Sequence, residues 1–522
     1  MGCPLFPMPS RTGKFLSDLQ EYRFNHPERD VHKDFRDIYK KNHIAVGWPK
    51  KYSKIFAHLA RPNTGSITGA ALGDEGKGRI IDNKIGALLS KPRTKCVVVI
   101  RFQGGNNSGH TIQVKNTTMA LHQIPCGIMY KKTICIIDRG MAVNPVDLVD
   151  EIQLVERIVG SVRKKLFLSR DAILNTDLDR AEELVNRKKQ GNASGGTGRG
   201  VAPSYAHHYD RLGFHISDYM GGDWEVKIGV QYDRYAKEFM LYGVKLKDIE
   251  VPDFAKTKRM KKEQKRKIGT RKEFLHRLAA ARKILLGRQM IKNTYVMHQK
   301  MYQDTSQAVL FEGAQSLGLH PWLGTIPDIT ASDTSVYGIQ TGTAFWKATD
   351  IEERIGVFKV PYTSSVGVRR MPTHAEDDWS KRVREEAHEY GTTTGRPRDI
   401  LYPDIPLLAY NCRMSGVEML AGTHLDVAWA SMPIKVCTHY TDKKGNMIPY
   451  QPGLVYLKDV VPHFIELPGW DGIAVRRAKS FRGLPDNAKK FLAFIQARLA
   501  VPIVAVTTGP GRENYLEIPS YS

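Results

Sequence analysis

Short runs of apolar residues recur along the chain, separated by longer polar or amphipathic stretches. Continuous apolar runs of this length predict strands that are buried on both faces. The predicted strands are Ile67–Leu72, Cys96–Ile100, Ala308–Phe311, Val417–Leu420, Ile434–Cys437 and Ile503–Val506. Phe274, Leu278 and Leu285 recur at helical spacing and predict a helix over about residues 271–286.

This alternation predicts an α/β fold with a large, mostly parallel, doubly wound sheet, helices on both faces and inserted subdomains, like a P-loop NTPase. Nearly every apolar run is followed by a loop rich in glycine and hydroxyl side chains. In open α/β sheets, ligands bind outside the carboxyl ends of the strands. Several such loops on one chain therefore predict a large site for anionic ligands.

Two segments stand apart from this pattern. Residues 1–65 are polar and basic but rich in aromatic side chains, so we expect an extension docked on the main domain, 66–522. Its last residues, Arg61–Gly65, are typical of a turn into that domain. The run 256–272 holds ten Lys or Arg residues and one acid, and we interpret it as a solvated surface insert.

Composition narrows the class of protein. The chain has 522 residues, of which 41% are hydrophobic, and its 78 Lys+Arg against 54 Asp+Glu give a net charge of +24. No apolar run is long enough to span a bilayer and no signal core is present, so we expect a cytoplasmic protein. This positive charge suits polyanionic substrates, a nucleic-acid partner or solubility alone. We do not expect a nucleic-acid partner, because the sequence contains no recognisable nucleic-acid-binding module.

Two loops carry the strongest candidate chemistry. The first, 73–78 (GDEGKG), follows a predicted strand and offers backbone N–H groups and Lys77 to a phosphate. Its Asp74 suits either a Mg²⁺ ligand or a general base. The second, 101–111, packs glycines and amides around His110, a candidate general acid. Taken alone, the first loop is as consistent with a plain glycine-rich turn.

Three further loops add weaker signals. Gly195–Gly200 offers backbone N–H groups to another phosphate. In 391–398 (GTTTGRPR), two arginines beside three threonines suit bidentate binding of a carboxylate. Residues 423–426 and residues 507–510 each follow a predicted strand. Asp426, at the end of the first segment, can accept hydrogen bonds from the N1–H and N2–H groups of guanine.

Together these motifs resemble the adenylosuccinate synthetase family, which joins IMP and L-aspartate at the expense of GTP. The resemblance runs from about Ile67 to Asn514. Nine motifs occur in the family's order: GDEGKG, RFQGGNNSGHT, LHQIPCGI, GTGRGVAPSYA, FEGAQ, GTIPDITASDT, GTTTGRPR, LPGW and TTGP. Each motif alone is weak, whereas nine in order are specific.

The resemblance implies a role for each matching residue. Asp74 would take the N1 proton of the purine, and His110 would act as general acid while the γ-phosphoryl group moves to the purine 6-oxygen. Aspartate would then displace phosphate from this 6-phosphoryl intermediate. Asp74 and the Gly109 carbonyl would hold Mg²⁺, and Arg211 would reach the nucleotide of a second subunit, which implies a homodimer.

The resemblance also implies three binding sets. The purine nucleotide would meet Asn107, Thr197, Arg211, Gln315, Thr330 and Val366. L-aspartate would meet Thr393, Thr394, Arg396 and Arg398. The donor nucleotide would meet Gly76, Lys77, Gly78, His424, Asp426, Thr508, Gly509 and Pro510.

Departures from the family pattern keep alternatives open. Ala71-Leu72 stands where the family usually has Gln-Trp, and Gly196 replaces a threonine; both would reshape the purine pocket. His424 replaces a lysine that packs on the guanine. The alternative enzyme uses dGMP, as in the viral-type 2-aminoadenylosuccinate synthetase, with ATP or dATP as donor. A non-catalytic nucleotide-sensing or nucleic-acid-binding protein is disfavoured because Asp74, His110 and both loop arginines are retained.

Overall fold

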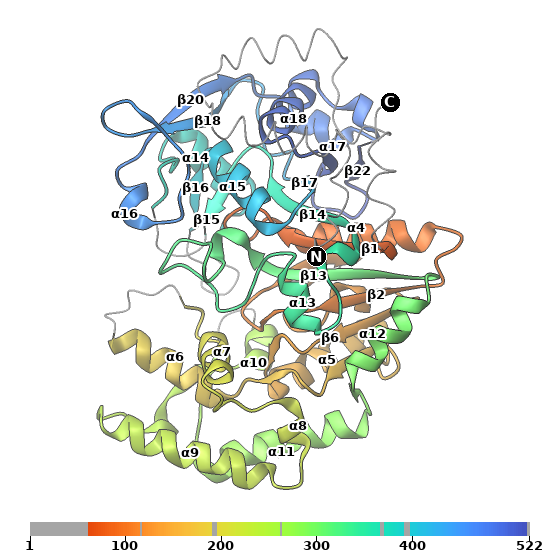
Figure 1. The fold of residues 1–522 in the computed structure, drawn as a ribbon, viewed down its shortest axis with the longest axis vertical. Coiled ribbons are helices and arrows are strands. Elements are labelled where there is room, and N and C mark those ends of the chain that lie inside the picture. The colour runs from red at the N-terminus through yellow and green to blue at the C-terminus, as the bar shows by residue number, and fades with distance from the viewer. Residues whose placement is uncertain are drawn as a thin grey trace, which may run out of the picture.

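The computed structural model describes residues 61–114, 117–189, 196–260, 264–365, 370–390 and 397–518. Its centre is a ten-stranded sheet of order β12-β8-β6-β2-β13-β1-β14-β17-β21-β22 (Figure 1). Neighbouring strands are parallel except the last pair, which is antiparallel. The strands are β1 Arg61–Gly69, β2 Cys96–Arg101, β6 Thr133–Ile137, β8 Leu166–Ser169, β12 Ile291–Lys292, β13 Gln307–Ser316, β14 Ile351–Lys359, β17 Met419–Thr423, β21 Ile503–Thr507 and β22 Tyr515–Glu517.

Both faces of this sheet are covered. Successive side chains of a strand point to opposite faces. In β2, Val97 and Val99 belong to one buried cluster, and Val98 and Ile100 belong to the other. This arrangement explains why the strand sequences are continuously apolar, and it confirms the predicted doubly wound α/β fold.

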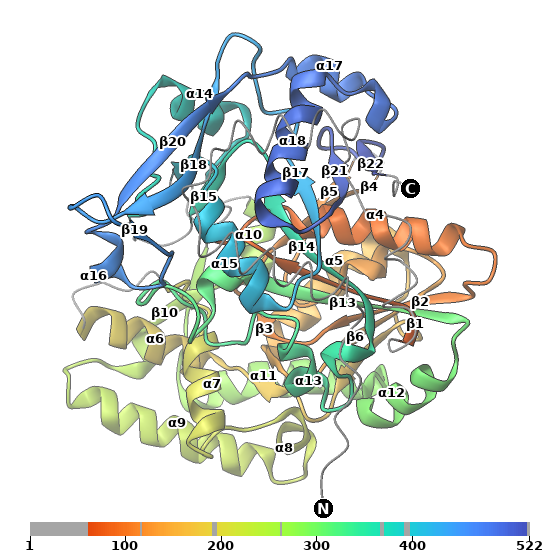
Figure 2. The same ribbon diagram turned by 45° about the horizontal axis from the view of Figure 1, so that its top comes forward.

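Helices from different parts of the chain form the two outer layers. The first cluster includes residues of α4 (Lys77–Ser90), α5 (Pro145–Val159) and α11 (Arg271–Gly287). The second includes residues of α15 (Ile405–Ser415) and α18 (Asp486–Leu499), which lie on the same face in Figure 2. The predicted helix at 271–286 is therefore confirmed as α11, and its start is fixed by a capping box between Thr270 and Glu273.

Two groups of smaller elements flank the sheet (Figure 1). One consists of α6 (Asp177–Lys189), α7 (Val201–Tyr209), α8 (Ile216–Met220), α9 (Trp224–Met240), α10 (Phe254–Met260) and the hairpin of β10 (Glu250–Pro252) with β11 (Lys265–Lys267). The other includes β18 (Ile434–Thr441), β19 (Met447–Ile448), β20 (Val461–Leu467), α14 (Asp378–Glu386), α16 (Leu454–Leu457) and α17 (Gly472–Arg477).

The remaining elements are short. The α-helices and strands among them are α12 (Thr294–Gln303), α13 (Gly338–Thr343), β3 (Gly104–Gly105), β4 (His110–Val114), β5 (Thr117–Leu121), β7 (Met141–Val143), β9 (Ile173–Leu174), β15 (Thr363–Ser365) and β16 (Asp399–Leu401). No helix of the described residues is long and apolar enough to cross a membrane.

Two predictions from the sequence were wrong in detail, and one central strand was not predicted. The predicted strand Ile434–Cys437 exists as β18, but it belongs to an antiparallel sheet with β19 and β20. The predicted turn Arg61–Gly65 is the first half of β1, anchored because the Arg61 guanidinium donates to the carbonyl oxygens of Met301 and Gln307, at 2.6 and 3.0 Å. The central strand β14 was missed because charged residues, in IEERIGVFK, interrupt its apolar pattern.

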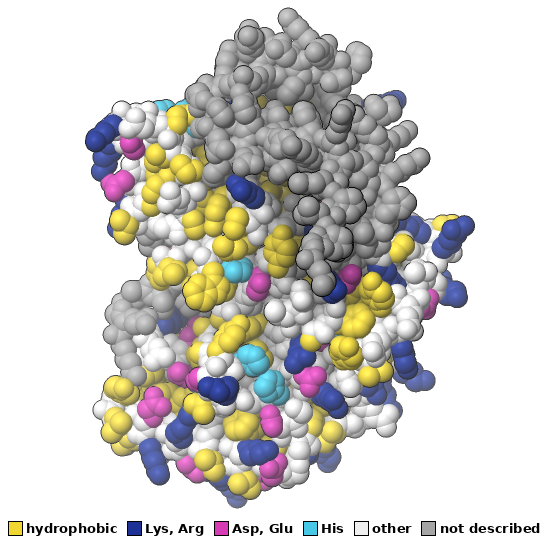
Figure 3. Space-filling model, in the orientation of Figure 1, with side chains coloured by type: hydrophobic (Ala, Val, Ile, Leu, Met, Phe, Trp, Pro, Cys, Tyr) yellow, Lys and Arg dark blue, Asp and Glu magenta, His cyan; other side chains and the backbone are white. Residues whose placement is uncertain are grey.

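The basic run is only partly a solvated surface. Residues 261–263 lie outside the described residues, and 265–267 form β11. Arg266 of this strand is largely buried and forms two hydrogen bonds with Asp177, at 2.5 and 3.1 Å. On the face shown in Figure 3, lysine and arginine side chains are scattered among acidic and hydrophobic ones instead of forming one continuous patch.

Candidate active site

The loop after β1 is built around a buried carboxylate. Glu75 is fully buried and accepts hydrogen bonds from the Gly73 backbone N–H and from Lys77 Nζ, both at 2.7 Å. Burial alone would raise the pKa of Glu75, but Lys77 lowers it below its usual value. Gly76, with φ of +85°, precedes the first residue of α4. Lys77, predicted to meet a phosphate, is thus held inside the loop at the start of α4.

His110 lies against this loop, at the start of β4. A Cβ atom on Gly78 would come within 3.1 Å of the His110 Cβ, so the glycine allows the close approach. His110 Nδ1 lies 2.5 Å from Glu312 Oε1 of β13, and the Cys126 backbone N–H donates to the other oxygen of Glu312 at 2.8 Å. His110 Nε2 is buried and has no hydrogen-bond partner among the described residues.

Glu312 decides how His110 is protonated. An ionised carboxylate only accepts, so the proton of the contact belongs to His110 Nδ1. Burial lowers the pKa of His110 below its usual value, and Glu312 opposes this effect only in part. The ligand-capable atoms of His110, Cys126 and Glu312 lie within 4.8 Å of one another, but they already bond to each other. The arrangement fixes the histidine ring and leaves Nε2 as its reactive nitrogen.

Asp74 meets the loop predicted to bind aspartate. It has φ of +58° and forms an ion pair with Arg398 Nη1, which also donates to Glu389 Oε2 at 2.8 Å. Asp74 is 37% exposed, whereas Glu389 is buried. Thr393, Thr394 and Arg396 of the same loop, and Val366, lie outside the described residues. Within the described residues, the ion pair between Asp74 and Arg398 brings the loop 73–78 and the end of the loop 391–398 together.

Two of the residues predicted to bind the acceptor nucleotide contact each other. Gln315 has φ of +56° and donates through Nε2 to Asn107 Oδ1 at 3.0 Å. Gln315 Oε1 and Thr330 Oγ1 are buried without a partner among the described residues. Such groups are costly unless a ligand or water satisfies them. These residues therefore suit a polar ligand at the carboxyl end of β13.

The loop before α7 is organised differently from the prediction. The Gly198 and Gly200 N–H groups, predicted to bind a phosphate, donate to the carboxylate of Glu183 at 2.8 and 2.6 Å. A Cβ on Gly196 would lie 2.5 Å from Glu183 Oε1, so the glycine makes room for this carboxylate. Thr197 is exposed in this loop, and Arg211 is exposed in the turn after α7.

The residues predicted to bind the donor lie after β17 and β21. His424, with φ of +57°, contacts the Tyr362 hydroxyl through Nδ1 at 3.0 Å. Asp426 is nearly buried and accepts from Arg476 Nε at 2.9 Å. Thr508 Oγ1 is buried and has no partner within the described ranges.

Hydrogen bonds join this region to the first loop. Arg79 Nη1 donates to the Gly509 carbonyl at 3.0 Å, which ties α4 to the loop containing Pro510. Thr423 Oγ1 donates to the Glu75 carbonyl at 2.6 Å. The carboxyl ends of β1, β17 and β21 are thus connected as one surface, as the loop pattern predicted.

Several functional candidates escaped sequence reasoning. Glu312 sits in an apolar run, AVLFEG, and a buried acid in a strand was the available signal. Lys359 and Tyr362, which both bind Glu389, lie about 30 residues from it in the chain, and no spacing pattern in the sequence links the three.

The two departures from the family pattern, Ala71 and Leu72, are buried, and the Ala71 carbonyl accepts from the Gly318 N–H at 3.1 Å. Leu72 packs in a small hydrophobic cluster.

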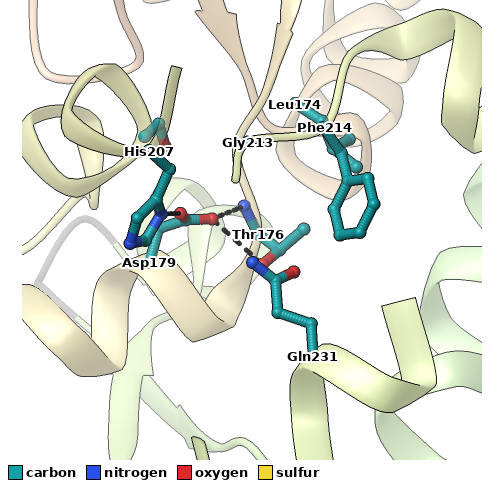
Figure 4. A pocket seen from close by; sticks show the side chains of 8 residues that line it. Leu174, Thr176, Asp179, His207, Gly213, Phe214 and Gln231 are labelled. Atoms are coloured by element: carbon teal, nitrogen blue, oxygen red, sulfur yellow. Dashed lines mark hydrogen bonds and ion pairs between the residues drawn. The ribbon is translucent and has the colours of Figure 1, made fainter. Parts of the chain in front are cut away.

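A small pocket lies beside α7 (Figure 4). It is lined by Leu174, Thr176, Asp179, Ser204, His207, Gly213, Phe214 and Gln231. His207 is nearly buried between Asp179, at 3.3 Å, and Glu182, at 3.0 Å. Burial alone would lower the pKa of His207, but these carboxylates raise it to about 10. His207 is therefore a charged group that ties α6 to α7.

Comparisons with known proteins agree with this geometry. The sequence model described as adenylosuccinate synthetase matches residues 66–516. The adenylosuccinate synthetase of Thermoanaerobacter sp. (strain X514) is 33% identical over 87% of this chain and 99% of its own length. That of Halothermothrix orenii is 31% identical over 86% and 97%.

Two solved structures are also similar. The fully ligated adenylosuccinate synthetase of Plasmodium falciparum matches with a TM-score of 0.76 and 27% identity, over 88% of this chain and 100% of that one. The succinoaminodeoxyadenylate synthetase of cyanophage S-2L, bound to dGMP and dATP, matches with a TM-score of 0.50 and 16% identity, over 88% and 96%. This second likeness shows a shared fold alone.

Proposed function

Because the chain belongs to the adenylosuccinate synthetase family, we propose that the groups gathered at the carboxyl edge of the central sheet form its active site. The protein is a ligase that joins IMP and L-aspartate in a GTP-dependent reaction. The observation that carries the site is that Asp74 lies on the loop after β1 and His110 packs against this loop, each held by a charged residue from another strand or loop.

In the first step, Asp74 takes the N1 proton of IMP, and the 6-oxygen attacks the γ-phosphorus of GTP. The bond to GDP breaks and a 6-phosphoryl nucleotide forms. His110 donates from Nε2 to the transferring group, which requires the imidazolium form because Nδ1 already holds a proton against Glu312. The phosphate charge and Glu312 both favour this cation. Glu312 is therefore a positioning residue for His110.

In the second step, the amine of L-aspartate attacks C6 and phosphate leaves. Arg398 binds a carboxylate of aspartate through its planar fork, together with Thr393, Thr394 and Arg396. Glu389 supports this role because it holds Arg398 through Nη1, the nitrogen that also pairs with Asp74. Asn107, Gln315 and Thr330 bind the acceptor, and Asp426 with Thr508 binds the donor base.

The residues present fit a bound Mg²⁺. The carboxylate of Asp74 and the carbonyl of Gly109 are hard oxygen donors, and Asp74 is partly exposed and Gly109 exposed. When bound, the ion would neutralise charge on the donor phosphates. We place it at these two residues.

The acceptor is IMP, and the dGMP alternative rests on the substitutions at Ala71, Leu72 and Gly196 together with a fold-level likeness. We propose GTP as the bound donor because Asp426 is retained after β17, with its second carboxylate oxygen left for guanine N–H groups. We also propose a homodimer. Arg211 is exposed, its side chain has no hydrogen bond or ion pair with a described residue, and its neighbours Tyr209 and Leu212 are 76% and 54% exposed.

The test removes each acid–base group while leaving its shape. Asp74→Asn and His110→Asn are each expected to lower kcat by about 10²–10⁴-fold, the usual contribution of a positioned acid or base. Binding of IMP, followed by titration calorimetry, is expected to stay within about threefold of the wild type. Asp378→Asn, at a 92% exposed acid of α14, is the control and keeps full turnover. Unchanged kcat in Asp74→Asn would refute the assigned role.

A further inference from the structure

A buried carboxylate lies between the proposed aspartate loop and the proposed donor pocket. Glu389 is only 1% exposed and accepts from three side chains: Lys359 Nζ, the Tyr362 hydroxyl at 2.5 Å and Arg398 Nη1 at 2.8 Å. Burial alone would raise the pKa of Glu389, but Lys359 and its other donors hold it well below the usual range. Glu389 is therefore ionised and can only accept hydrogen bonds.

This charge fixes the direction of the neighbouring hydrogen bonds. Tyr362 has one hydroxyl proton and uses it to bind Glu389. Its oxygen must then accept from His424 Nδ1, which lies 3.0 Å away. Burial, Lys359 and Arg79 lower the pKa of His424, so the ring is neutral with its proton on Nδ1. The bonds run in one direction, from His424 through Tyr362 to Glu389.

The other end of the chain reaches the proposed general base. Arg398 binds Glu389 and Asp74 with the same nitrogen, Nη1. Tyr362 is fully buried, so neither of its hydrogen bonds is exchanged with bulk water. Five side chains therefore connect the donor pocket at His424 with Asp74, and Tyr362 is the link between the two halves.

We propose that Tyr362 is a positioning residue that makes binding of the donor nucleotide and of L-aspartate interdependent, because its hydroxyl joins His424 to Glu389. A donor that orders His424 holds Tyr362 and Glu389 in place, and this fixes Arg398 for the aspartate carboxylate. Such coupling is reciprocal between the two ligands. The inference rests on the proposed function, which assigns His424 to the donor and Arg398 to aspartate.

The test measures this interdependence by equilibrium binding. L-aspartate is titrated calorimetrically into the full chain with IMP and Mg²⁺ present, with and without a non-hydrolysable GTP analogue. In the wild type, the analogue is expected to tighten aspartate binding by about fivefold or more, a common size for coupling between sites. In Tyr362→Phe, which removes only the hydroxyl, the effect is expected to fall below about twofold.

A matched variant separates coupling from stability. Tyr440 is also fully buried and donates to a buried carboxylate, that of Asp404, outside this chain of hydrogen bonds. Tyr440→Phe is expected to lower Tm by a similar amount and to keep the full coupling. Coupling retained in Tyr362→Phe, or absent from the wild type, would overturn the inference.

One further variant distinguishes failure of this inference from failure of the proposed site. Arg398→Lys keeps the charge but loses the planar fork, and it is expected to weaken aspartate binding about tenfold. If Arg398→Lys binds aspartate as tightly as the wild type, the site assignment itself is wrong. If it binds weakly while Tyr362→Phe keeps the coupling, only the role of Tyr362 is wrong.

Discussion

At the scale of single residues, the site depends on buried partners that hold the exposed functional groups. His110 was predicted from its loop, but the group that sets its protonation, Glu312, comes from a strand about 200 residues away. Glu389 has the same relation to Arg398. Local motifs reveal groups that contact ligands, whereas their partners are brought in by tertiary packing, and a single sequence contains no spacing that identifies them.

His207 gives a prediction for stability against pH. Its folded pKa of about 10 is above the unfolded value of about 6.5, because Asp179 and Glu182 stabilise the cation. The contribution is therefore complete below about pH 6.5 and is lost as the pH rises through about 10. We expect His207→Gln to lower the free energy of unfolding by about 1–3 kcal/mol at pH 6.

The measurement is urea unfolding of the wild type and His207→Gln at pH 6 and at pH 10, with the difference smaller at the higher pH. The control is His276→Gln, at an exposed histidine of α11, which should show no difference between the two pH values. An equal loss of stability at both pH values would show that His207 acts through packing and not through its charge.

At the scale of elements, the basic insert 256–272 supports the loop that we propose to bind the acceptor nucleotide. Arg266 of β11 binds Asp177 at the start of α6, which Arg180 also contacts at 3.3 Å. Arg180 forms an ion pair with Asp147 of α5, and Asn106 donates to the same carboxylate at 3.0 Å. The insert thereby supports the loop that contains Asn107. Its charge count indicated a surface segment, and this one buried arginine could not be recognised from composition.

We therefore expect Arg266→Met to change both stability and the KM for IMP, whereas substitution of the neighbouring lysines changes neither. Removing one cation from this buried cluster is expected to cost about 2–3 kcal/mol in the free energy of unfolding. It is also expected to raise the KM for IMP by several-fold while the KM for GTP stays unchanged. Lys265→Met and Lys267→Met, at the exposed positions on either side, are the controls and should change neither quantity. Equal effects in all three variants would contradict the supporting role of Arg266.

At the scale of the whole molecule, the sequence predicted the architecture better than its details. The strands β1, β2, β13, β17 and β21 were predicted from continuous apolar runs, since both sheet faces are buried. The mixed pattern of β14 hid a central strand, and β18 joined a different sheet because apolar runs do not show which strand they pair with. The extension 1–60 lies outside the described residues, so its docking stays a prediction.

The fold brings the carboxyl ends of β1, β13, β17 and β21 to one edge, and the account requires that this edge performs one reaction. The most direct test is turnover by the wild-type protein with L-aspartate and Mg²⁺, crossing IMP and dGMP against GTP and ATP, with product followed by its ultraviolet absorbance. We predict turnover with IMP and GTP that exceeds every other pair. Turnover only with dGMP would show that Gly196 and its neighbours accept a 2-amino purine and would contradict the assignment.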